Sequence, residues 1–253
     1  MLFCVDRRLR VLLSDTPLWR KALAEYLGSL LLATIVIGSG IAAQTYSPHA
    51  IGLELLENAA ATGLGLYVII ATLGPISGAH FNPIISFVDA AFGGISWRTA
   101  RWYLVVQVAG CTSGAILANL MFSRSAISLS SDHRATLAHG FSEVAATAGL
   151  VLVIFALAKA KRSSLAPAAV GAYIAGAYFF TSSTSFANPA IVVGRMFSNS
   201  FAGIAPASAP LFVGAEIVGG VVGFALVKAL FTNFTPLDAA RVTDALVPEG
   251  SPS

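Results

Sequence analysis

Charged side chains are scarce in this sequence, and their scarcity excludes a water-soluble fold. Only 11% of the 253 residues are Asp, Glu, Lys or Arg, whereas 56% are hydrophobic. A soluble domain has about 25% charged residues, which cover its surface. With a mean hydropathy of +0.79, the chain is predicted to lie in a lipid bilayer. Its net charge of +3 is too small to indicate a nucleic-acid partner.

The sequence also has few cysteines, and it lacks the pattern of a signal peptide and the common catalytic motifs. The two cysteines, Cys4 and Cys111, are too few for a disulfide framework, and Cys111 is interpreted as a small buried hydrophobic residue. Residues 1–21 are basic, but their apolar runs are too short for a signal-peptide core. Neither a Gly-x-Ser-x-Gly nor a His-Glu-x-x-His motif occurs. We therefore expect no enzyme activity, no cofactor and no metal site.

Apolar stretches are the main feature that is present. A hydrocarbon core about 30 Å thick needs about 20 apolar residues per spanning helix. The stretches that qualify are residues 22–43, 56–74, 100–122, 138–158, 166–185 and 209–231. Residues 82–92 and 188–199 are apolar but too short, and we predict that they enter the membrane as half-helices. The predicted fold class is an all-α membrane protein with six transmembrane helices and two re-entrant half-helices.

The Lys and Arg residues predict the orientation of these spans. With the N-terminus inside, twelve of the 15 Lys and Arg residues fall on the inner side. Only Arg124, Arg134 and Arg195 remain outside. Such an excess of positive charge marks the cytoplasmic face. The sequence therefore predicts a plasma-membrane protein, in a bacterium the inner membrane, with both termini in the cytoplasm.

The predicted domain at residues 22–232, between a lead-in at 1–21 and a tail at 233–253, contains an internal repeat. Its halves are residues 22–122 and 138–231, and each half ends its second span with an Asn-Pro half-helix. Three spans per half reverse the direction of the second copy, so the repeat is inverted and its functional centre is expected near the midplane. The other matched pairs are Glu25-x-x-x-Ser29 with Glu143-x-x-x-Thr147, and Gln107-x-x-Gly110-x-x-x-Gly114 with Glu216-x-x-Gly219-x-x-x-Gly223.

The two Asn-Pro pairs, Asn82-Pro83 and Asn188-Pro189, predict helices that begin inside the membrane. Asn is a favoured helix N-cap, and Pro at the first helical position loses no hydrogen bond. A broken helix at that depth is tolerated only where it is buried in protein or lines a cavity. Opposed helix N-termini disfavour cations, and the asparagine amides can donate to a passing oxygen. We predict a pore, with two structural breaks around a closed core as the alternative.

These motifs resemble the aquaporin or major intrinsic protein family over about residues 20–232. "SGAHFNPIISF" is similar to the first family signature, with Ile84 after Asn82-Pro83 in place of Ala, and "FANPA" matches the second with Ala190. The resemblance implies six tilted helices around one pore per protomer, a homotetramer and passive diffusion. It also implies that Glu25 and Glu143 hydrogen-bond the re-entrant loops.

The resemblance further implies a selectivity filter on the outer side of the two asparagines. Carried over by spacing from Asn82 and Asn188, its residues are Thr62, Gly176, Ser185 and Ile191. Ile191 stands where most relatives have an arginine that donates hydrogen bonds. The implied filter is wide and mildly apolar, and it suits glycerol-like polyols, urea and neutral metalloid hydroxides such as arsenous acid, with water as a further candidate. In this respect the sequence resembles bacterial channels associated with arsenicals.

The roles of three other polar residues stay open at the level of sequence. Arg195 lies one helical turn beyond Ile191, where it either faces the pore mouth or pairs with loop carbonyls. His80 either senses pH or fixes the first loop. Glu216 corresponds to the neutral Gln107 and either packs helices together or has a function of its own.

A secondary transporter is the competing function, because transporters share inverted repeats and broken helices. Such a protein needs an acidic group in the solute path, and the only intramembrane candidates are Glu25, Glu143 and Glu216. Permeability that rises linearly with the solute gradient and ignores ionophores rejects this alternative.

Overall fold

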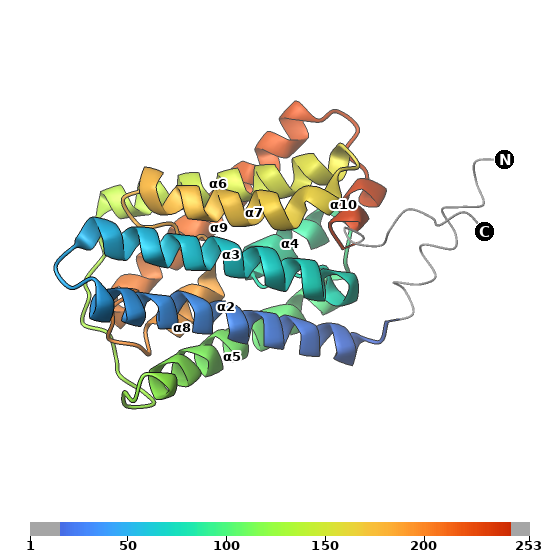
Figure 1. The fold of residues 1–253 in the computed structure, drawn as a ribbon. Coiled ribbons are helices and arrows are strands. Elements are labelled where there is room, and N and C mark those ends of the chain that lie inside the picture. Colours follow the sequence, from blue (N-terminus) through green and yellow to red (C-terminus); the bar gives the residue numbers. More distant parts are fainter. Residues whose placement is uncertain (1–15, 244–253) are drawn as a thin grey trace.

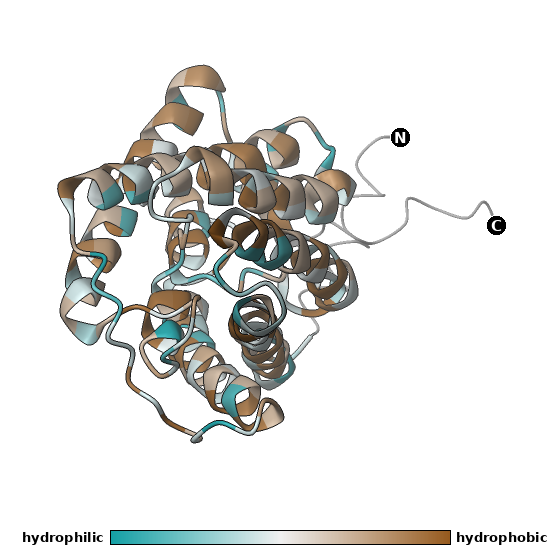
Figure 2. Cartoon of the chain, turned by 60° about the vertical axis from the view of Figure 1, so that its left-hand side comes forward, coloured by the Kyte–Doolittle hydropathy of each residue, from teal (hydrophilic) through white to brown (hydrophobic). Residues whose placement is uncertain are grey.

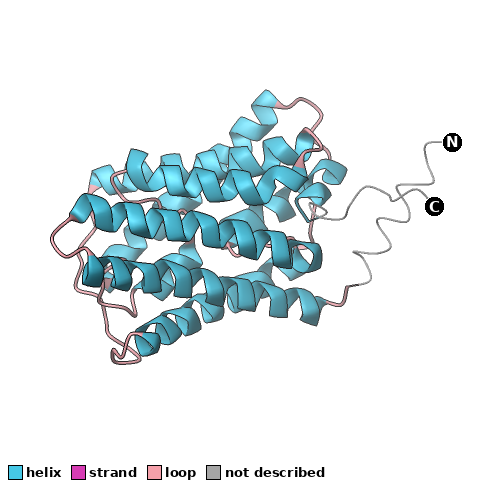
Figure 3. Ribbon diagram, in the orientation of Figure 1, coloured by secondary structure: helices cyan, strands magenta, loops and turns pink. Residues whose placement is uncertain are grey.

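The computed structural model describes residues 16–243, so Cys4 and the outer parts of both predicted tails lie outside the described residues. Within this range the chain is helical, with no strand (Figure 3). The long helices are α2 (Leu18–Tyr46), α3 (Ile51–Ser77), α5 (Trp97–Met121), α6 (Leu137–Lys159), α7 (Ala166–Phe180) and α9 (Ala209–Leu230). The shorter ones are α4 (Pro83–Phe92), α8 (Pro189–Arg195), α10 (Pro236–Thr243) and 3-10 turns at Ser163–Leu165 and Pro206–Ser208.

Six helical segments of the described chain are long and apolar enough to cross a membrane, counting the turn at Ser163–Leu165 with α7. This confirms the predicted spans and fold class. The helices run side by side, and α2 begins at the same end of the bundle at which α10 lies (Figure 1). We call this end the α10 end and the opposite one the far end.

Two predicted boundaries are wrong because the helices end early, the first of them at a run of polar residues. The fifth span was expected to reach residue 185, but α7 ends at Phe180. The sequence that follows, Thr-Ser-Ser-Thr-Ser, competes for backbone groups; the Thr181 hydroxyl, for example, donates to Ala177 O at 2.6 Å. The second half-helix was expected to run to residue 199, but α8 ends at Arg195.

Part of the predicted tail folds back onto the bundle as α10. Thr235 and Asp238 form a capping box, in which Thr235 N donates to Asp238 Oδ2 at 2.9 Å and Asp238 N donates to the Thr235 hydroxyl at 3.3 Å. Lys159 and Arg241 pair with the Asp238 carboxylate at 3.0 and 2.8 Å. Burial raises the pKa of Asp238, but hydrogen bonds from Thr235 and Lys159 outweigh it and leave the pKa below its usual value.

The surface and the interior have the polarity of a membrane protein. Figure 2 shows hydrophobic residues along the helices and hydrophilic ones mainly in the loops. Large apolar side chains such as Leu64, Val105 and Val221 are exposed, whereas Glu25 and Gln107 are fully buried. A surface of apolar side chains is suited to contact with lipid. Lipid offers no hydrogen bonds, so polar groups within the membrane must find their partners inside the protein. The chain is a multi-pass membrane protein.

The predicted repeat appears in the packing of the long helices. The two most extensive helix contacts are α2 with α5 and α6 with α9. Gly110 and Gly114 bring α5 against backbone oxygens of α2, and Gly219 and Gly223 bring α9 against α6 in the same way. Glycine permits this approach because it has no Cβ.

Replacing Gly114 with alanine should therefore destabilise the protein. A Cβ at this position would overlap Leu30 O, and the resulting strain is expected to cost about 1–3 kcal/mol. The thermal midpoint of the purified protein in detergent measures this loss. Gly176→Ala is the matched control, because no atom lies within 4 Å of its added Cβ. Equal midpoints for the two variants would contradict the packing role of Gly114.

Candidate functional site

The two half-helices begin near the middle of the bundle at asparagines that cap them. Asn82 Oδ1 accepts a hydrogen bond from Ile84 N at 2.9 Å, and Asn188 Oδ1 accepts one from Ala190 N at 3.0 Å. A proline follows each asparagine as the first helical residue, where no backbone N–H is required. Helices α4 and α8 both pack against α5 and α9. Local sequence thus starts each half-helix, and the long helices hold it.

The asparagine side chains also join the two halves of the repeat to each other. Asn82 Nδ2 donates to Ala187 O at 2.6 Å, and Asn188 Nδ2 donates to Phe81 O at 2.8 Å. An amide nitrogen carries two protons. Each of these bonds uses one proton and leaves the other for a molecule beside the amide.

The loops that precede the asparagines are held in an unusual backbone conformation. Ala79 and Phe81 have φ values of 50° and 47°, and their counterparts Ser185 and Ala187 have values of 48° and 47°. Left-handed conformations are costly for residues with a Cβ, and they persist only where surrounding contacts impose them. The symmetry of these values indicates that both halves use the same device.

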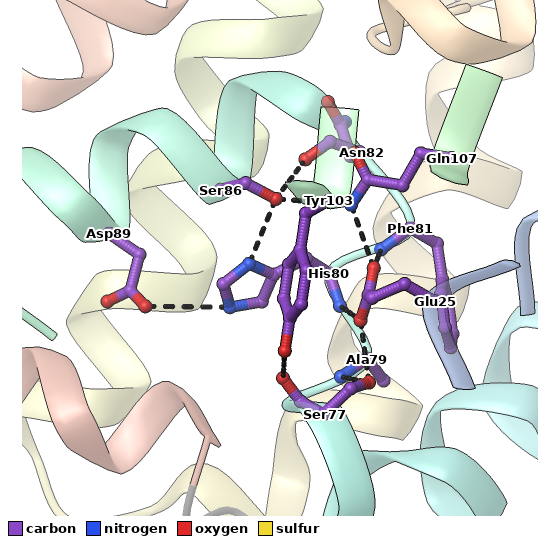
Figure 4. Close-up of polar contacts among 10 residues, drawn as sticks. All are labelled: Glu25, Ser77, Ala79, His80, Phe81, Asn82, Ser86, Asp89, Tyr103 and Gln107. Carbon is purple, nitrogen blue, oxygen red and sulfur yellow. Dashed lines mark hydrogen bonds and ion pairs between the residues drawn. The ribbon is translucent and has the colours of Figure 1, made fainter. Parts of the chain in front are cut away.

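A buried glutamate, Glu25, supplies the contacts that hold the first loop (Figure 4). Glu25 Oε1 accepts hydrogen bonds from the Ser77 hydroxyl at 2.6 Å and from His80 N at 3.0 Å. Glu25 Oε2 accepts from Phe81 N at 2.7 Å and from Gln107 Nε2 at 2.8 Å. The carboxylate thus binds the two backbone amides that precede Asn82.

The second loop is held by two glutamates. Glu143 accepts hydrogen bonds from Phe186 N at 2.9 Å and from Ala187 N at 2.7 Å. Glu216 accepts one from Asn188 N at 2.9 Å, whereas its counterpart Gln107 donates to Glu25. A carboxylate has only acceptors, so Glu216 cannot repeat the amide's donation when ionised.

Both ring nitrogens of His80 face protein groups (Figure 4). Nδ1 lies 3.1 Å from the Ser86 hydroxyl, and Nε2 lies 3.6 Å from Asp89 Oδ2. Tyr103 packs edge-on against the ring at 5.5 Å between centroids, and its hydroxyl donates to Ser77 O at 2.8 Å. These contacts orient the imidazole within the first loop.

A cavity runs past both asparagines along the bundle. On α3 it is lined by residues four apart, from Thr62 near the far end to Gly74 near the α10 end. Asn82 and Asn188 both line it between these limits, and Val242 of α10 lines it at the α10 end. The cavity has a volume of about 80 Å³. One water needs about 10–15 Å³ by this measure, so several waters fit.

The remaining cavity wall is mostly apolar, and no carboxylate among residues 16–243 lines it. Leu66, Ile70, Val170 and Ile174 are among its residues, and His80 contributes a ring. Glu25, Glu143 and Glu216, the acidic groups that a transporter would need in the solute path, are absent from the lining.

The structure corrects one of the four residues carried over for the filter. Thr62, Ser185 and Ile191 line the cavity, but Gly176 is exposed and does not. The face of α7 that lines the cavity carries Ile174 and Tyr178, and a residue midway between them points the other way. Counting twelve residues back from Asn188 fails because a count along the chain does not fix how α7 is rotated about its axis.

Tyr178 is the cavity residue that sequence reasoning missed. Its hydroxyl lies 3.2 Å from the Thr62 hydroxyl. Residues 166, 170, 174 and 178 of α7 all line the cavity. This four-residue spacing was present in the sequence, but the sequence alone does not say which face of the helix meets the cavity.

Arg195 is buried and lines the same cavity. Its Nε donates to Ala202 O, and its guanidinium carbon lies 3.4 Å from the centroid of the Phe186 ring. The two alternatives from the sequence therefore coincide, because the side chain contacts a loop carbonyl and also faces the cavity.

Ile84, which departs from the Ala of the first signature, does not line the cavity. Its side chain packs against Gly220 of α9, where an added Cβ would lie 2.6 Å from Ile84 Cγ2. The missing side chain at Gly220 makes room for the larger residue.

Residues 12–185 match the family described as Major intrinsic protein. The chain belongs to the major intrinsic protein family. One relative in this family, aquaglyceroporin AqpS of Rhizobium meliloti (strain 1021), is 42% identical over 225 residues, which cover 89% of this chain and 96% of the relative.

Other major intrinsic proteins match shorter parts or the fold alone. Aquaporin NIP3-1 of Oryza sativa subsp. japonica is 32% identical over 165 residues, or 63% of this chain and 52% of that protein. The X-ray structure of the aquaglyceroporin from Plasmodium falciparum superposes with a TM-score of 0.65 over 88% of this chain and 99% of that one. At 19% identity this likeness shows the shared fold.

Proposed function

We propose that this major intrinsic protein is a passive channel for small uncharged solutes. The candidate solutes are glycerol-like polyols, urea and neutral metalloid hydroxides such as arsenous acid, with water as a further candidate. The observation that carries the proposal is one cavity lined by both Asn82 and Asn188 and by no carboxylate of the described residues. The 42% identity to a protein named an aquaglyceroporin supports the same solute class.

The chemistry of the wall explains why neutral solutes are favoured. The asparagine amides offer hydrogen bonds to an oxygen, while most of the wall offers none. The half-helices direct their N-termini toward the same region, and their partial positive charge opposes cations. The transporter alternative is less favoured, because none of its candidate coupling groups, Glu25, Glu143 and Glu216, lines the cavity.

The proposed filter consists of Thr62, Ser185 and Ile191, with Tyr178 instead of Gly176. The Ile191 side chain has no hydrogen-bond donor that could replace the water molecules around a solute. The filter is therefore expected to select only weakly for water over larger neutral solutes. The Tyr178 ring makes the filter narrower than a glycine would leave it. Small polyols and trihydroxides remain the best match because their hydroxyls can reach the Thr62 and Tyr178 hydroxyls.

The assembly and location are proposals as well. We infer a homotetramer in the plasma membrane, in a bacterium the inner membrane, with the α10 end in the cytoplasm. The orientation is supported by positive residues near this end, among them Arg98, Lys159 and Arg162.

Solute flux into proteoliposomes tests the channel proposal. Stopped-flow light scattering should show glycerol entry far above that of empty vesicles, and cells should take up arsenite. The rate should rise linearly with the gradient and be unchanged by ionophores, because no coupling ion is involved. Saturable, ionophore-sensitive flux would favour the secondary transporter instead.

A pair of tryptophan variants on α3 links this flux to the cavity. Leu66 lines the cavity, whereas Val68, two residues further along the helix, is exposed on the outer face. Leu66→Trp should reduce glycerol flux by an order of magnitude or more because the ring fills the conduit, and Val68→Trp should leave it unchanged. Equal flux in the two variants would place the solute path elsewhere.

A further inference from the structure

Polar side chains from four parts of the chain line the far end of the cavity. Thr62 comes from α3, Tyr178 from α7, Ser185 from the second loop and Arg195 from α8. Each is 2–3% exposed. We call these four residues the far-end cluster.

The Arg195 guanidinium is fixed in place, but only one of its three nitrogens donates a hydrogen bond to the described part of the chain. Nε donates to Ala202 O, and the Phe186 ring stacks against the guanidinium face. No acceptor among residues 16–243 bonds Nη1 or Nη2, and no carboxylate in this range forms an ion pair with Arg195. A buried guanidinium whose two Nη groups lack acceptors is unfavourable, so we expect a molecule in the cavity to supply them.

Ser185 gives a second, independent sign of a ligand. Its hydroxyl has no hydrogen-bond partner in the described part of the chain, although the residue is 3% exposed and lines the cavity. Buried hydroxyls normally have a partner. The nearby hydroxyls of Thr62 and Tyr178 lie 3.2 Å apart and are each able to donate and accept.

We propose that the far-end cluster is a recognition site for neutral solutes with two or more hydroxyls, and that Arg195 is its specificity-determining residue. This rests on the proposed channel function. Two oxygens of one solute accept from the planar guanidinium, as oxygens do in bidentate arginine contacts. The solute's hydroxyl protons are donated to Ser185 and to the hydroxyl pair of Thr62 and Tyr178.

The position of Arg195 explains how the site coexists with Ile191. Arg195 is four residues beyond Ile191, on the same face of α8 and about 6 Å further toward the far end. A solute that enters from the far end is therefore recognised at Arg195, one helical turn before it reaches the apolar constriction at Ile191. The guanidinium repels cations at this point, including hydrated protons.

Permeability measurements on Arg195 variants in proteoliposomes test the site. Arg195→Gln should lower glycerol permeability about tenfold relative to water, the factor expected for losing one charge-assisted hydrogen bond. Proton conductance, followed with an enclosed pH dye, should rise because the cation is gone. Arg195→Lys should preserve proton exclusion with intermediate glycerol permeability. Arg124→Gln is the matched control, since Arg124 is a partly exposed far-end arginine that does not line the cavity and donates to Asn199 O at 3.1 Å.

If Arg195→Gln does not fold, two milder variants still test the site. Tyr178→Phe and Ser185→Ala each remove one hydroxyl with little change in volume, and each should lower the glycerol-to-water permeability ratio. An unchanged ratio in both would overturn the site.

Other outcomes separate this inference from the channel proposal. If Arg195→Gln lowers water and glycerol permeability equally and leaves proton conductance unchanged, Arg195 is a structural residue and the inference is wrong. If inorganic phosphate blocks the wild type but not Arg195→Gln, the site is one for anions and the neutral-solute assignment is wrong. If the wild type carries no solute faster than empty vesicles, the channel proposal itself fails.

Discussion

Replacing Glu25 with leucine is expected to abolish the folded protein. The Glu25 carboxylate is fully buried and accepts four hydrogen bonds, two of them from the backbone amides of His80 and Phe81. Each buried donor left without a partner costs about 1–3 kcal/mol. Four such losses approach the whole free energy of unfolding of a typical protein, about 5–15 kcal/mol. The loop would also lose the contacts that impose its left-handed residues.

The yield of monodisperse protein in detergent, measured by size-exclusion chromatography, checks this expectation. Glu143→Leu serves as a graded comparison, because Glu143 accepts from two backbone amides, Phe186 N and Ala187 N, and among the described residues has no counterpart of the Ser77 and Gln107 donors that Glu25 binds. It should reduce the yield less than Glu25→Leu does. A reversed order would show that the number of orphaned donors does not determine the loss.

Ile191→Arg is expected to lower glycerol permeability by at least about tenfold. The longer side chain enters a cavity that Ile191 lines, and its charge stands one turn from Arg195 on the same helix face. Like charges four residues apart on a helix repel each other, so the new guanidinium is pushed into the solute path. A solute larger than water is obstructed most. Stopped-flow light scattering with glycerol and with an impermeant osmolyte separates the two permeabilities.

Two companion variants make the Ile191 result specific. Ile191→Leu changes shape but neither charge nor hydrogen bonding, and it should retain most glycerol permeability. In the double variant Ile191→Arg with Arg195→Gln, the repulsion is removed, so the two effects should not add. If Ile191→Arg leaves glycerol permeability unchanged, Ile191 does not belong to the filter.

Much of the architecture followed from local sequence. Six spans were recognised because the apolar length of a segment is a property of that segment alone. The starts of α4 and α8 were recognised because Asn-Pro fixes a helix N-terminus without help from distant residues. The α10 helix was missed, although Thr235 and Asp238 carry a capping-box pattern, because a short polar segment folds only against a surface such as that of α6 and α4.

The error at Gly176 has a tertiary cause. Gly63 of α3 packs directly against Gly171 of α7, since a Cβ on Gly63 would lie 2.8 Å from Gly171 O. This contact sets the rotation of α7 and turns Tyr178, not Gly176, toward the cavity. Rotation about a helix axis depends on which neighbours touch it, and no count along the chain contains that information.

The sequence by itself therefore determined the number of spans, the inverted repeat and the two capped half-helices, because hydrophobic length and N-capping act within a few consecutive residues. Only the tertiary structure decided that Tyr178 and Arg195 share a cavity with Thr62 and Ile191. These residues lie on three helices, α3, α7 and α8, and their side chains meet only after packing has fixed the rotation of each helix.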